Sequence, residues 1–256
     1  MLYFVDAVLS SQRTVMAQFS QSQIHPQSLN LRDLNAQFET AHPLDIVRWA
    51  VTTFPQGLVQ TSAFSILVIT HMLYREVCPR PPVPVIFLDT LHHFQATLDT
   101  VEQATRHYNL DLRIYRVREV STREGFASRY GERLWANNVN RFHYLTKVEP
   151  LERAMEELQV TAWFTGRRRD QSSSRRQMPI LELDPQGRLK INPLATWDRK
   201  QVWSYTFNHG VLYNPLHDQG YTSIGDEPLT TPIADGEHER AGRWRGSAKT
   251  ECGIHL

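Results

Sequence analysis

An apolar run that ends in an acid, Val85-Ile86-Phe87-Leu88-Asp89, constrains the fold of this chain more than any other segment. A strand without polar alternation is typical of a parallel sheet that is covered on both faces. Further strands are predicted at 57–62, 111–117 and 161–164, and helices at 64–77, 95–108 and 148–158. Because strands and helices alternate, we expect an α/β fold, a parallel sheet with helices on both faces.

The length of the chain, 256 residues, fits one large domain with appendages. Residues 1–28 are rich in Gln and Ser, and we expect a weakly ordered N-terminal extension there. The main domain is expected over 29–210, with a hairpin near 184–187 and a helix over 198–208. The remainder, 211–256, is too long and irregular for an idle loop, so we expect a functional lid or mobile tail.

Composition excludes several classes of protein. A formal net charge of +1 argues against bulk nucleic-acid binding, which normally needs a basic excess. The chain has no apolar run near the roughly 18 residues of a membrane span. Its apolar N-terminal stretch contains Asp6 and lacks a basic start, so it is a poor secretory signal. Two cysteines cannot supply a four-thiolate metal site, and their scarcity fits a reducing cytoplasm.

Ligands of a parallel sheet bind beyond the carboxyl ends of its strands, so the strand ends at 61–64, 89–90 and 165–167 are candidates, and two of them begin longer polar segments. Thr61-Ser62-Ala63-Phe64-Ser65 has the small hydroxyl residues and backbone N–H groups that attract phosphate, although it is not a Walker loop. An ordinary helix N-cap explains the same residues. The segment 166–176 has five arginines in eleven residues, which suits bidentate phosphate or sulfate recognition but also describes a solvated basic loop.

The third candidate is Cys252, four residues from the C-terminus. A thiol reacts as thiolate, and nearby cations lower its pKa. Arg243, Arg245, Lys249 and His255 are close in sequence, although an inert terminal thiol is the usual alternative. We interpret Cys78 as a packing residue, and the histidines His92, His93 and His107 as structural rather than metal ligands.

Five strings in the same order resemble the phosphoadenylyl-sulfate (PAPS) reductases, from about residue 31 to residue 256. The most specific is Lys249-Thr250-Glu251-Cys252-Gly253-Ile254-His255, which matches the family's KxECGxH signature. The others are Phe87-Leu88-Asp89-Thr90 followed by His93-Phe94, Lys147-Val148-Glu149-Pro150-Leu151, Gly166-Arg167-Arg168-Arg169-Asp170-Gln171 with Arg175, and Gly220-Tyr221-Thr222-Ser223-Ile224-Gly225-Asp226.

The resemblance implies an adenine-nucleotide α-hydrolase-like fold, a homodimer, and reduction of PAPS to sulfite and adenosine 3′,5′-bisphosphate in sulfate assimilation. Cys252 would attack the sulfuryl sulfur and become S-sulfocysteine. Because the chain has no suitably placed second thiol, an external dithiol, thioredoxin or glutaredoxin, must supply both electrons. The resemblance also assigns substrate contacts to Ser62, Phe64, Asp89, Lys147, Arg168, Arg169, Gln171, Arg175, Arg243, Lys249 and His255.

The cysteine positions separate two branches of relatives. Iron–sulfur adenylyl-sulfate (APS) reductases resemble this family but have four cluster cysteines, where this chain has Phe142, His143, Asp226 and Leu229. We therefore expect no cofactor, and PAPS as substrate, with Arg168, Arg169 and Arg175 holding its 3′-phosphate. A cluster-free APS reductase is the alternative within the same class.

The phosphate loop departs from the family pattern. Ser65 replaces a glycine, and the helical residues from Ile66 onward follow with about two residues missing. A shorter loop moves backbone donors by several ångströms, since each residue spans up to about 3.6 Å. A catalytically impaired nucleotide-binding module is therefore a second alternative, unless the loop is remodelled around Thr61 and Ser62.

Overall fold

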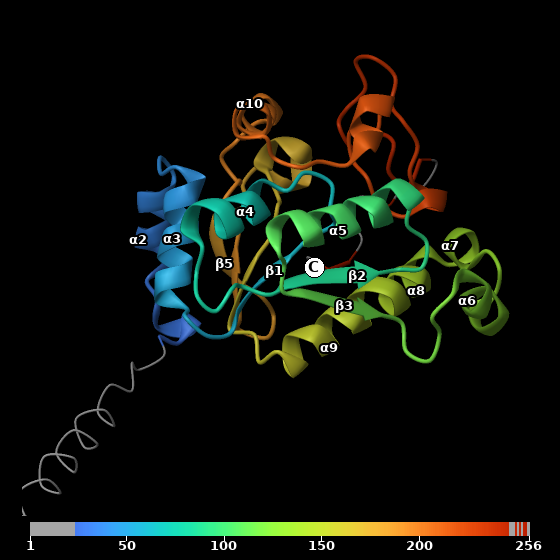
Figure 1. Cartoon of the computed structure of the whole chain (residues 1–256), viewed down its shortest axis with the longest axis horizontal. Coiled ribbons are helices and arrows are strands. Elements are labelled where there is room, and N and C mark those ends of the chain that lie inside the picture. Colours follow the sequence, from blue (N-terminus) through green and yellow to red (C-terminus); the bar gives the residue numbers. More distant parts are fainter. Residues whose placement is uncertain (1–23, 246–248, 250, 252, 255–256) are drawn as a thin grey trace, which may run out of the picture.

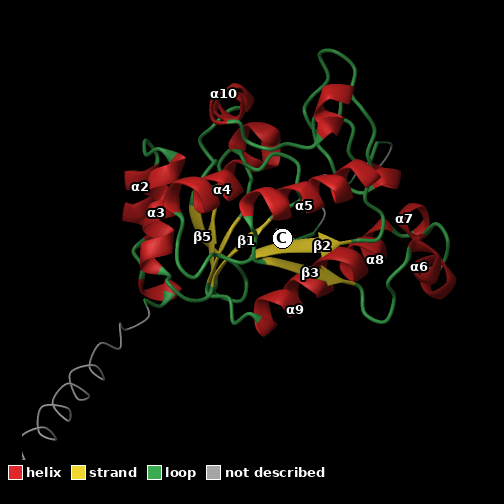
Figure 2. Cartoon of the chain, viewed as in Figure 1, coloured by secondary structure: helices red, strands yellow, loops and turns green. Residues whose placement is uncertain are grey.

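A computed structural model describes residues 24–245, 249, 251, 253 and 254. Six strands form one sheet in the order β3-β2-β1-β4-β6-β5 (Figures 1 and 2). All neighbouring strands are parallel except β5 and β6, which pair as an antiparallel hairpin at one edge. The strands are β1 (Leu58–Thr61), β2 (Val85–Asp89), β3 (Leu112–Arg116), β4 (Ala162–Phe164), β5 (Leu181–Leu183) and β6 (Leu189–Ile191).

Helices cover both faces of this sheet, as the sequence predicts. In Figure 1, α5 lies on one side of β2 and α9 lies on the other. The α-helices are α2 (Leu31–Phe38), α3 (Pro43–Thr53), α4 (Val68–His71), α5 (Gln95–Tyr108), α6 (Arg123–Tyr130), α7 (Leu134–Asn137), α8 (Val139–His143), α9 (Glu149–Glu157) and α10 (Arg199–His209). Two π-helical turns, η2 (Met72–Val77) and η3 (Tyr144–Val148), extend α4 and join α8 to α9.

The core follows from the alternation of side chains along each strand. Val59, Ile86 and Trp163 point to one face and pack against α9. Their neighbours in the same strands point to the opposite face, where α3, α4, α5 and α10 bury them. The predicted α/β class is therefore confirmed, and the predicted ranges 85–89 and 95–108 match β2 and α5.

The helix predicted over 64–77 is wrong at its start, because α4 begins only at Val68. Phe64 has φ +51°, in the left-handed region, and its N–H is held by the hydroxyl of Ser62 at 3.1 Å. This turn prevents the backbone from entering the helix directly after β1.

A second segment of the chain holds the rest of this loop in an extended form. The carbonyl of Ser65 accepts from the N–H of Asn214 at 2.8 Å, and the N–H of Leu67 donates to Leu212 at 3.2 Å. The carbonyl of Ser65 and the N–H of Leu67, which would form hydrogen bonds within a helix, are therefore bonded to residues 212–214 instead. The shortened loop forms an antiparallel bridge with residues 212–214.

The two ends of the described chain contain little regular secondary structure. Residues Pro26–Ser28 form the 3₁₀ turn η1 inside the stretch that the sequence assigns to an extension. Past α10, the segment to residue 245 has only the 3₁₀ turns η6 (Pro215–Gln219) and η7 (Glu227–Leu229). Within the described ranges, no helix is both long and apolar enough to cross a membrane. The predicted domain boundaries and tail mobility stay predictions.

Candidate active site

A cavity of about 270 Å³ opens at the carboxyl ends of β1, β2 and β4. The loop after β1 and the Thr165–Arg168 segment after β4 line it, as expected for a parallel sheet. Residues from the irregular C-terminal part close the other side. The predicted site residues that line the cavity are Ser62, Phe64, Lys147, Arg168, Gln171, Arg175 and Arg243.

Three predicted residues do not line the cavity. Asp89 accepts from the N–H of Leu91 at 2.9 Å and pairs with Arg116 at 3.1 Å. Lys249 donates to the side-chain carbonyl of Asn140 at 2.5 Å. These contacts assign Asp89 to a turn and Lys249 to a contact between the tail and α8.

Arg169 is the third, and it differs from its neighbours Arg168 and Arg175. Its Nε donates to the carbonyl of Met178 at 2.8 Å, and its guanidinium pairs with Glu39 beside α2. The side chain of Arg169, at the start of the η4 turn (Arg169–Gln171), therefore points toward Glu39 and not into the cavity. Cys252 and His255 lie outside the described residues.

The loop after β1 offers backbone donors to an anion. In the described part of the chain, the N–H groups of Ala63, Ser65 and Ile66 have no acceptor, and all three residues line the cavity. Successive free N–H groups in a turn form an anion-binding concavity. The backbone turn at Ser62 and Phe64 therefore leaves three N–H donors facing the cavity, where an anion could bind.

Ser65 itself makes a contact that a glycine cannot make. Its hydroxyl lies 2.8 Å from Nε2 of His217 in η6. Burial, reinforced by Arg199 and Arg168, lowers the pKa of His217 to about 4, so the ring is neutral at pH 7. A neutral ring can accept from the serine hydroxyl, which fixes the loop against the wall of the cavity.

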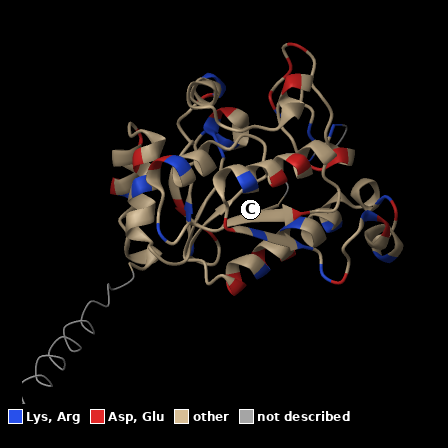
Figure 3. Ribbon diagram, viewed as in Figure 1, with Lys and Arg blue, Asp and Glu red and all other residues tan. Residues whose placement is uncertain are grey.

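The arginines after β4 are paired with acids. Arg168 contacts Asp170 at 2.9 Å and Glu239 at 2.6 Å, and Arg167 pairs with Glu182. Basic and acidic positions lie interspersed along the ribbon in Figure 3. The acids therefore offset much of the positive charge of these guanidinium groups. An anionic ligand must compete with the carboxylates for hydrogen bonds to the arginines.

Glu251 is the most informative of these acids, because it precedes Cys252. Arg175 binds both of its carboxylate oxygens at 2.7 Å, and Arg240 lies 3.4 Å away. Burial raises the pKa of Glu251, but the nearby arginines prevail and hold it below the ordinary value. Ile254 also lines the cavity and packs on the α9 face of the core.

Arg243 approaches the cavity through a gap left by a glycine. A Cβ at Gly225 would lie 2.2 Å from a terminal nitrogen of Arg243, so a side chain there would displace the guanidinium. Arg243 donates to the carbonyl of Ile224 at 3.1 Å and lies 4.5 Å above the ring of Trp244. This stacking orients the guanidinium toward the cavity.

A buried charge cluster supports the floor of the site. Asp226 is fully buried, forms an ion pair with Lys147, and lies 3.4 Å from His143. Burial raises the pKa of Asp226, but Lys147 and His143 outweigh it and hold that pKa well below its usual value. Burial lowers the pKa of His143 to about 4. An ionised Asp226 carboxylate that pairs with Lys147, beside a neutral histidine, is the resulting state.

Sequence reasoning missed His217 and Glu239, which line the cavity. It treated His143 and Asp226 only as positions without cysteine. The string that contains Asp226 is one of the five that resemble the reductase family. An isolated acid in an irregular segment does not indicate an ion pair with Lys147, which lies 79 residues away in the sequence.

The sequence profile of the phosphoadenosine phosphosulfate reductase domain matches residues 58–232. The chain belongs to this reductase family. Phosphoadenosine phosphosulfate reductase of Emericella nidulans is 46% identical over 230 residues, which cover 88% of this chain and 75% of that protein. Adenosine 5′-phosphosulfate reductase of Salinibacter ruber is 43% identical, over 89% of each chain.

Solved structures agree with this family and with the fold. A crystal structure of PAPS reductase from Candida auris, in complex with phosphate, has a TM-score of 0.72 and 42% identity. It covers 78% of this chain and 96% of that chain. FMN adenylyltransferase of Candida glabrata has a TM-score of 0.53 at 14% identity, covering 86% and 85%, and it shows the adenine-nucleotide α-hydrolase-like fold alone. The family members are oxidoreductases that act on sulfur groups.

Proposed function

We propose that this chain reduces PAPS to sulfite and adenosine 3′,5′-bisphosphate with electrons from thioredoxin or glutaredoxin. The observation that carries the proposal is the position of Glu251 and Ile254, on either side of Cys252. Both line the cavity at the carboxyl ends of the strands. In the sequence, Cys252 follows Glu251 directly and precedes Ile254 by two residues, so it is the nucleophile nearest to the residues that line the proposed substrate cavity.

The first half of the proposed reaction is a transfer to sulfur. The thiolate of Cys252 attacks the sulfuryl sulfur of PAPS, and the bond from that sulfur to the phosphate oxygen breaks. The electron pair leaves with adenosine 3′,5′-bisphosphate, and S-sulfocysteine remains on the chain. Arginines near the tail favour the thiolate form that this attack requires.

The second half needs two electrons from outside. A thiolate of the reductant attacks Sγ of Cys252, which releases sulfite and leaves a mixed disulfide. The second thiol of the reductant then forms its own disulfide and returns Cys252 as thiolate. Cys78 lies on an exposed helix end, outside the residues that line the cavity, so it is not the second thiol.

The cavity residues divide between the charged parts of the substrate. The free N–H groups of the 63–66 loop and the hydroxyl of Ser62 suit the phosphosulfate. Arg168 and Arg175, with Gln171 beside them, suit a 3′-phosphate, because a guanidinium binds such a group through two parallel hydrogen bonds. We propose no cofactor. A homodimer and a cytoplasmic location also belong to the proposal.

A sulfite-release assay coupled to thioredoxin tests this proposal. The wild type is expected to release sulfite from PAPS, and Cys252→Ser is expected to release none while still binding the nucleotide. Cys78→Ser is the matched control, because it removes the other thiol. Full activity in Cys252→Ser would overturn the mechanism. PAPS binding without sulfite release by the wild type would leave the nucleotide-binding module as the function.

APS is a second candidate substrate, because relatives 38% to 43% identical are named adenosine 5′-phosphosulfate reductases. Parallel turnover of PAPS and APS separates the two. A preference for PAPS supports the assignment of the arginines to a 3′-phosphate.

A further inference from the structure

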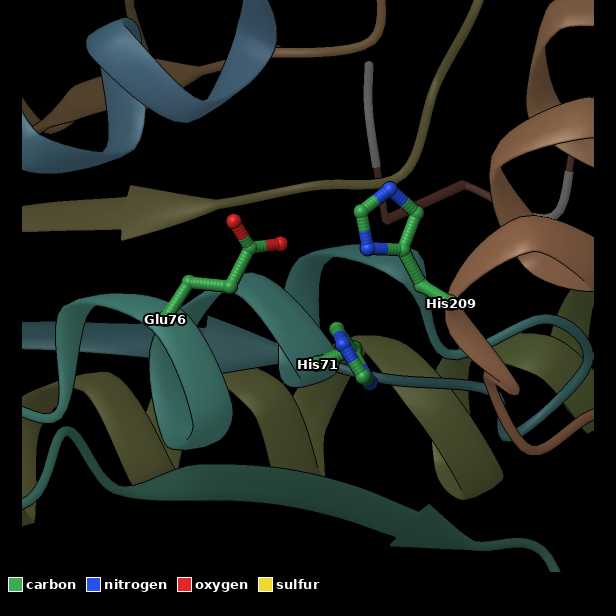
Figure 4. Close-up of side chains that lie close together, drawn as sticks. All are labelled: His71, Glu76 and His209. Carbon is green, nitrogen blue, oxygen red and sulfur yellow. The ribbon is translucent and has the colours of Figure 1, made fainter.

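Three side chains outside the cavity have their donor atoms close together. One ring nitrogen of His71, one carboxylate oxygen of Glu76 and one ring nitrogen of His209 all lie within 4.8 Å of one another. His71 ends α4, Glu76 lies in η2 and His209 ends α10. Figure 4 shows the carboxylate of Glu76 and the ring of His209 above the ring of His71. None of the three lines the cavity.

From this arrangement we propose a binding site for one divalent transition-metal ion, with zinc the metal that suits the donors best. Two imidazoles and one carboxylate are a known three-ligand set for zinc, with a fourth position left to water. Imidazole nitrogen favours zinc and its neighbours in the series over magnesium or calcium, which prefer oxygen alone. The site is independent of the reductase function.

Two tyrosines orient the ligands. The hydroxyl of Tyr205 donates to Glu76, and the ring of Tyr205 stacks on His209 with centroids 4.1 Å apart. Partners of this kind, one step out from the metal, fix the orientation of ligands in metal sites. Tyr205 therefore positions two of the three donors at once.

Tyr108 has the same relation to His71. Its hydroxyl oxygen lies 3.3 Å from Nδ1 of His71 and also accepts from the backbone N–H of Leu212 at 3.4 Å. In the tautomer in which Nδ1 donates to Tyr108, the lone pair of His71 lies on Nε2 and is available to a metal.

The donors must approach one another to bind an ion. Zinc–nitrogen bonds of about 2.0–2.1 Å place donors about 3.3 Å apart in a tetrahedron. The separation within 4.8 Å is therefore closed by small side-chain rotations. His209 is exposed at the end of α10, so its ring contacts with Tyr205 and His71, rather than core packing, restrain such a rotation.

The position of the ion gives it a structural role. α4 follows the loop that lines the cavity, and α10 precedes the 212–217 segment that bonds to that loop. An ion between α4 and α10 joins two elements that flank the same loop. The expected consequence is greater thermal stability on metal binding.

Cobalt binding to the full chain tests the site. Cys78→Ser and Cys252→Ser together remove the thiols, so that a visible Co²⁺ spectrum reports nitrogen and oxygen ligands alone. We expect one ion per chain, displacement by Zn²⁺, and a rise in Tm with either metal. His209→Ala, at an exposed position, is expected to keep the fold and to weaken Co²⁺ binding by more than about 100-fold, beyond the roughly 10- to 100-fold losses that outer-shell partners cause.

Two further variants make the result specific. Glu76→Gln is expected to weaken binding as His209→Ala does, whereas His25→Ala, which removes another exposed histidine, is expected to change nothing. No stoichiometric Co²⁺ binding by the thiol-free chain overturns the proposal. Binding that survives both ligand variants at full affinity also overturns it, because the ion then lies elsewhere.

Discussion

Arg175 binds both carboxylate oxygens of Glu251 at 2.7 Å, and this pair joins the arginine loop to the residue before Cys252. The side chain of Arg175 is 9% exposed and that of Glu251 16%, so water screens the pair little. A phosphate group of the substrate would bind the same guanidinium of Arg175 through two hydrogen bonds. The pair therefore couples the position of the tail to the occupancy of the anion site.

Glu251→Gln tests this coupling. The variant keeps the shape of the side chain but loses the charge that anchors it, and charged hydrogen bonds contribute about 1.5–3 kcal/mol each. We expect kcat to fall by about tenfold, because the tail is held less well, and KM for PAPS to stay equal or fall, because a competing anion is gone. Steady-state kinetics measure both. Glu237→Gln, whose partner Arg245 is at the surface, is the control. A rise in KM with unchanged kcat contradicts the coupling.

Arg175→Ala tests the assignment of the 3′-phosphate. Loss of a bidentate contact of about 1.5–3 kcal/mol corresponds to a roughly 10- to 100-fold rise in KM for PAPS. KM for APS, which lacks that phosphate, is expected to change much less. Arg169→Ala is the matched control, because this arginine from the same run points to Glu39, outside the cavity. Equal effects of Arg175→Ala on both nucleotides would sink the assignment.

The comparison of Arg169 with Arg175 also shows how far sequence reasoning reaches. Apolar runs and helical spacing predicted β2, α5 and the parallel sheet, because these patterns follow from burial on one or two faces. The run of arginines predicted that the segment after β4 belongs to a site, and Arg167, Arg168 and Arg175 of that run line the cavity. It did not separate the arginine that faces Glu39 from the one that faces Glu251, because that depends on the η4 and η5 (Ser173–Arg175) turns.

The loop after β1 shows a second limit of the sequence. Residues 66–77 read as the continuation of a helix, and locally they favour one. The start of this predicted helix is instead hydrogen-bonded to Leu212 and Asn214, which lie more than 140 residues away along the chain. A local pattern contains no information about such a partner. The same holds for His143, Lys147 and Asp226, which meet only in the folded chain.

Ser65→Gly tests the remodelled loop. Glycine restores the residue expected in this position but removes the 2.8 Å contact with His217. We expect KM for PAPS to rise about threefold to tenfold, since a neutral hydrogen bond contributes about 0.5–1.5 kcal/mol. Ser65→Thr, which keeps a hydroxyl, is expected to retain more affinity than Ser65→Gly. Tighter binding by the glycine variant contradicts the role of the contact.

The partly buried ring of His217 predicts a pH dependence of stability. Its pKa in the folded chain is about 4, and the pKa of an unfolded histidine is about 6.5. As the pH falls from 6.5 to 4, His217 binds a proton in the unfolded chain but stays neutral in the folded chain. The free energy of unfolding therefore falls over this window, by about 3 kcal/mol for this group. Urea unfolding at a series of pH values measures the slope, and His217→Asn is expected to reduce it. An unchanged slope in that variant contradicts the burial argument.

The ion pair of Lys147 with Asp226 gives the last prediction. Asp226 is fully buried, so Asp226→Asn leaves Lys147, whose side chain is only 10% exposed, without its carboxylate partner. Breaking such a pair from one side costs about 3–5 kcal/mol. The double variant Lys147→Met with Asp226→Leu removes both charges, and we expect it to unfold at higher urea concentration than Asp226→Asn does. Equal stabilities would mean that packing, rather than the unpaired charge, dominates at this position. Nucleotide binding is expected to weaken in both, because Lys147 lines the cavity.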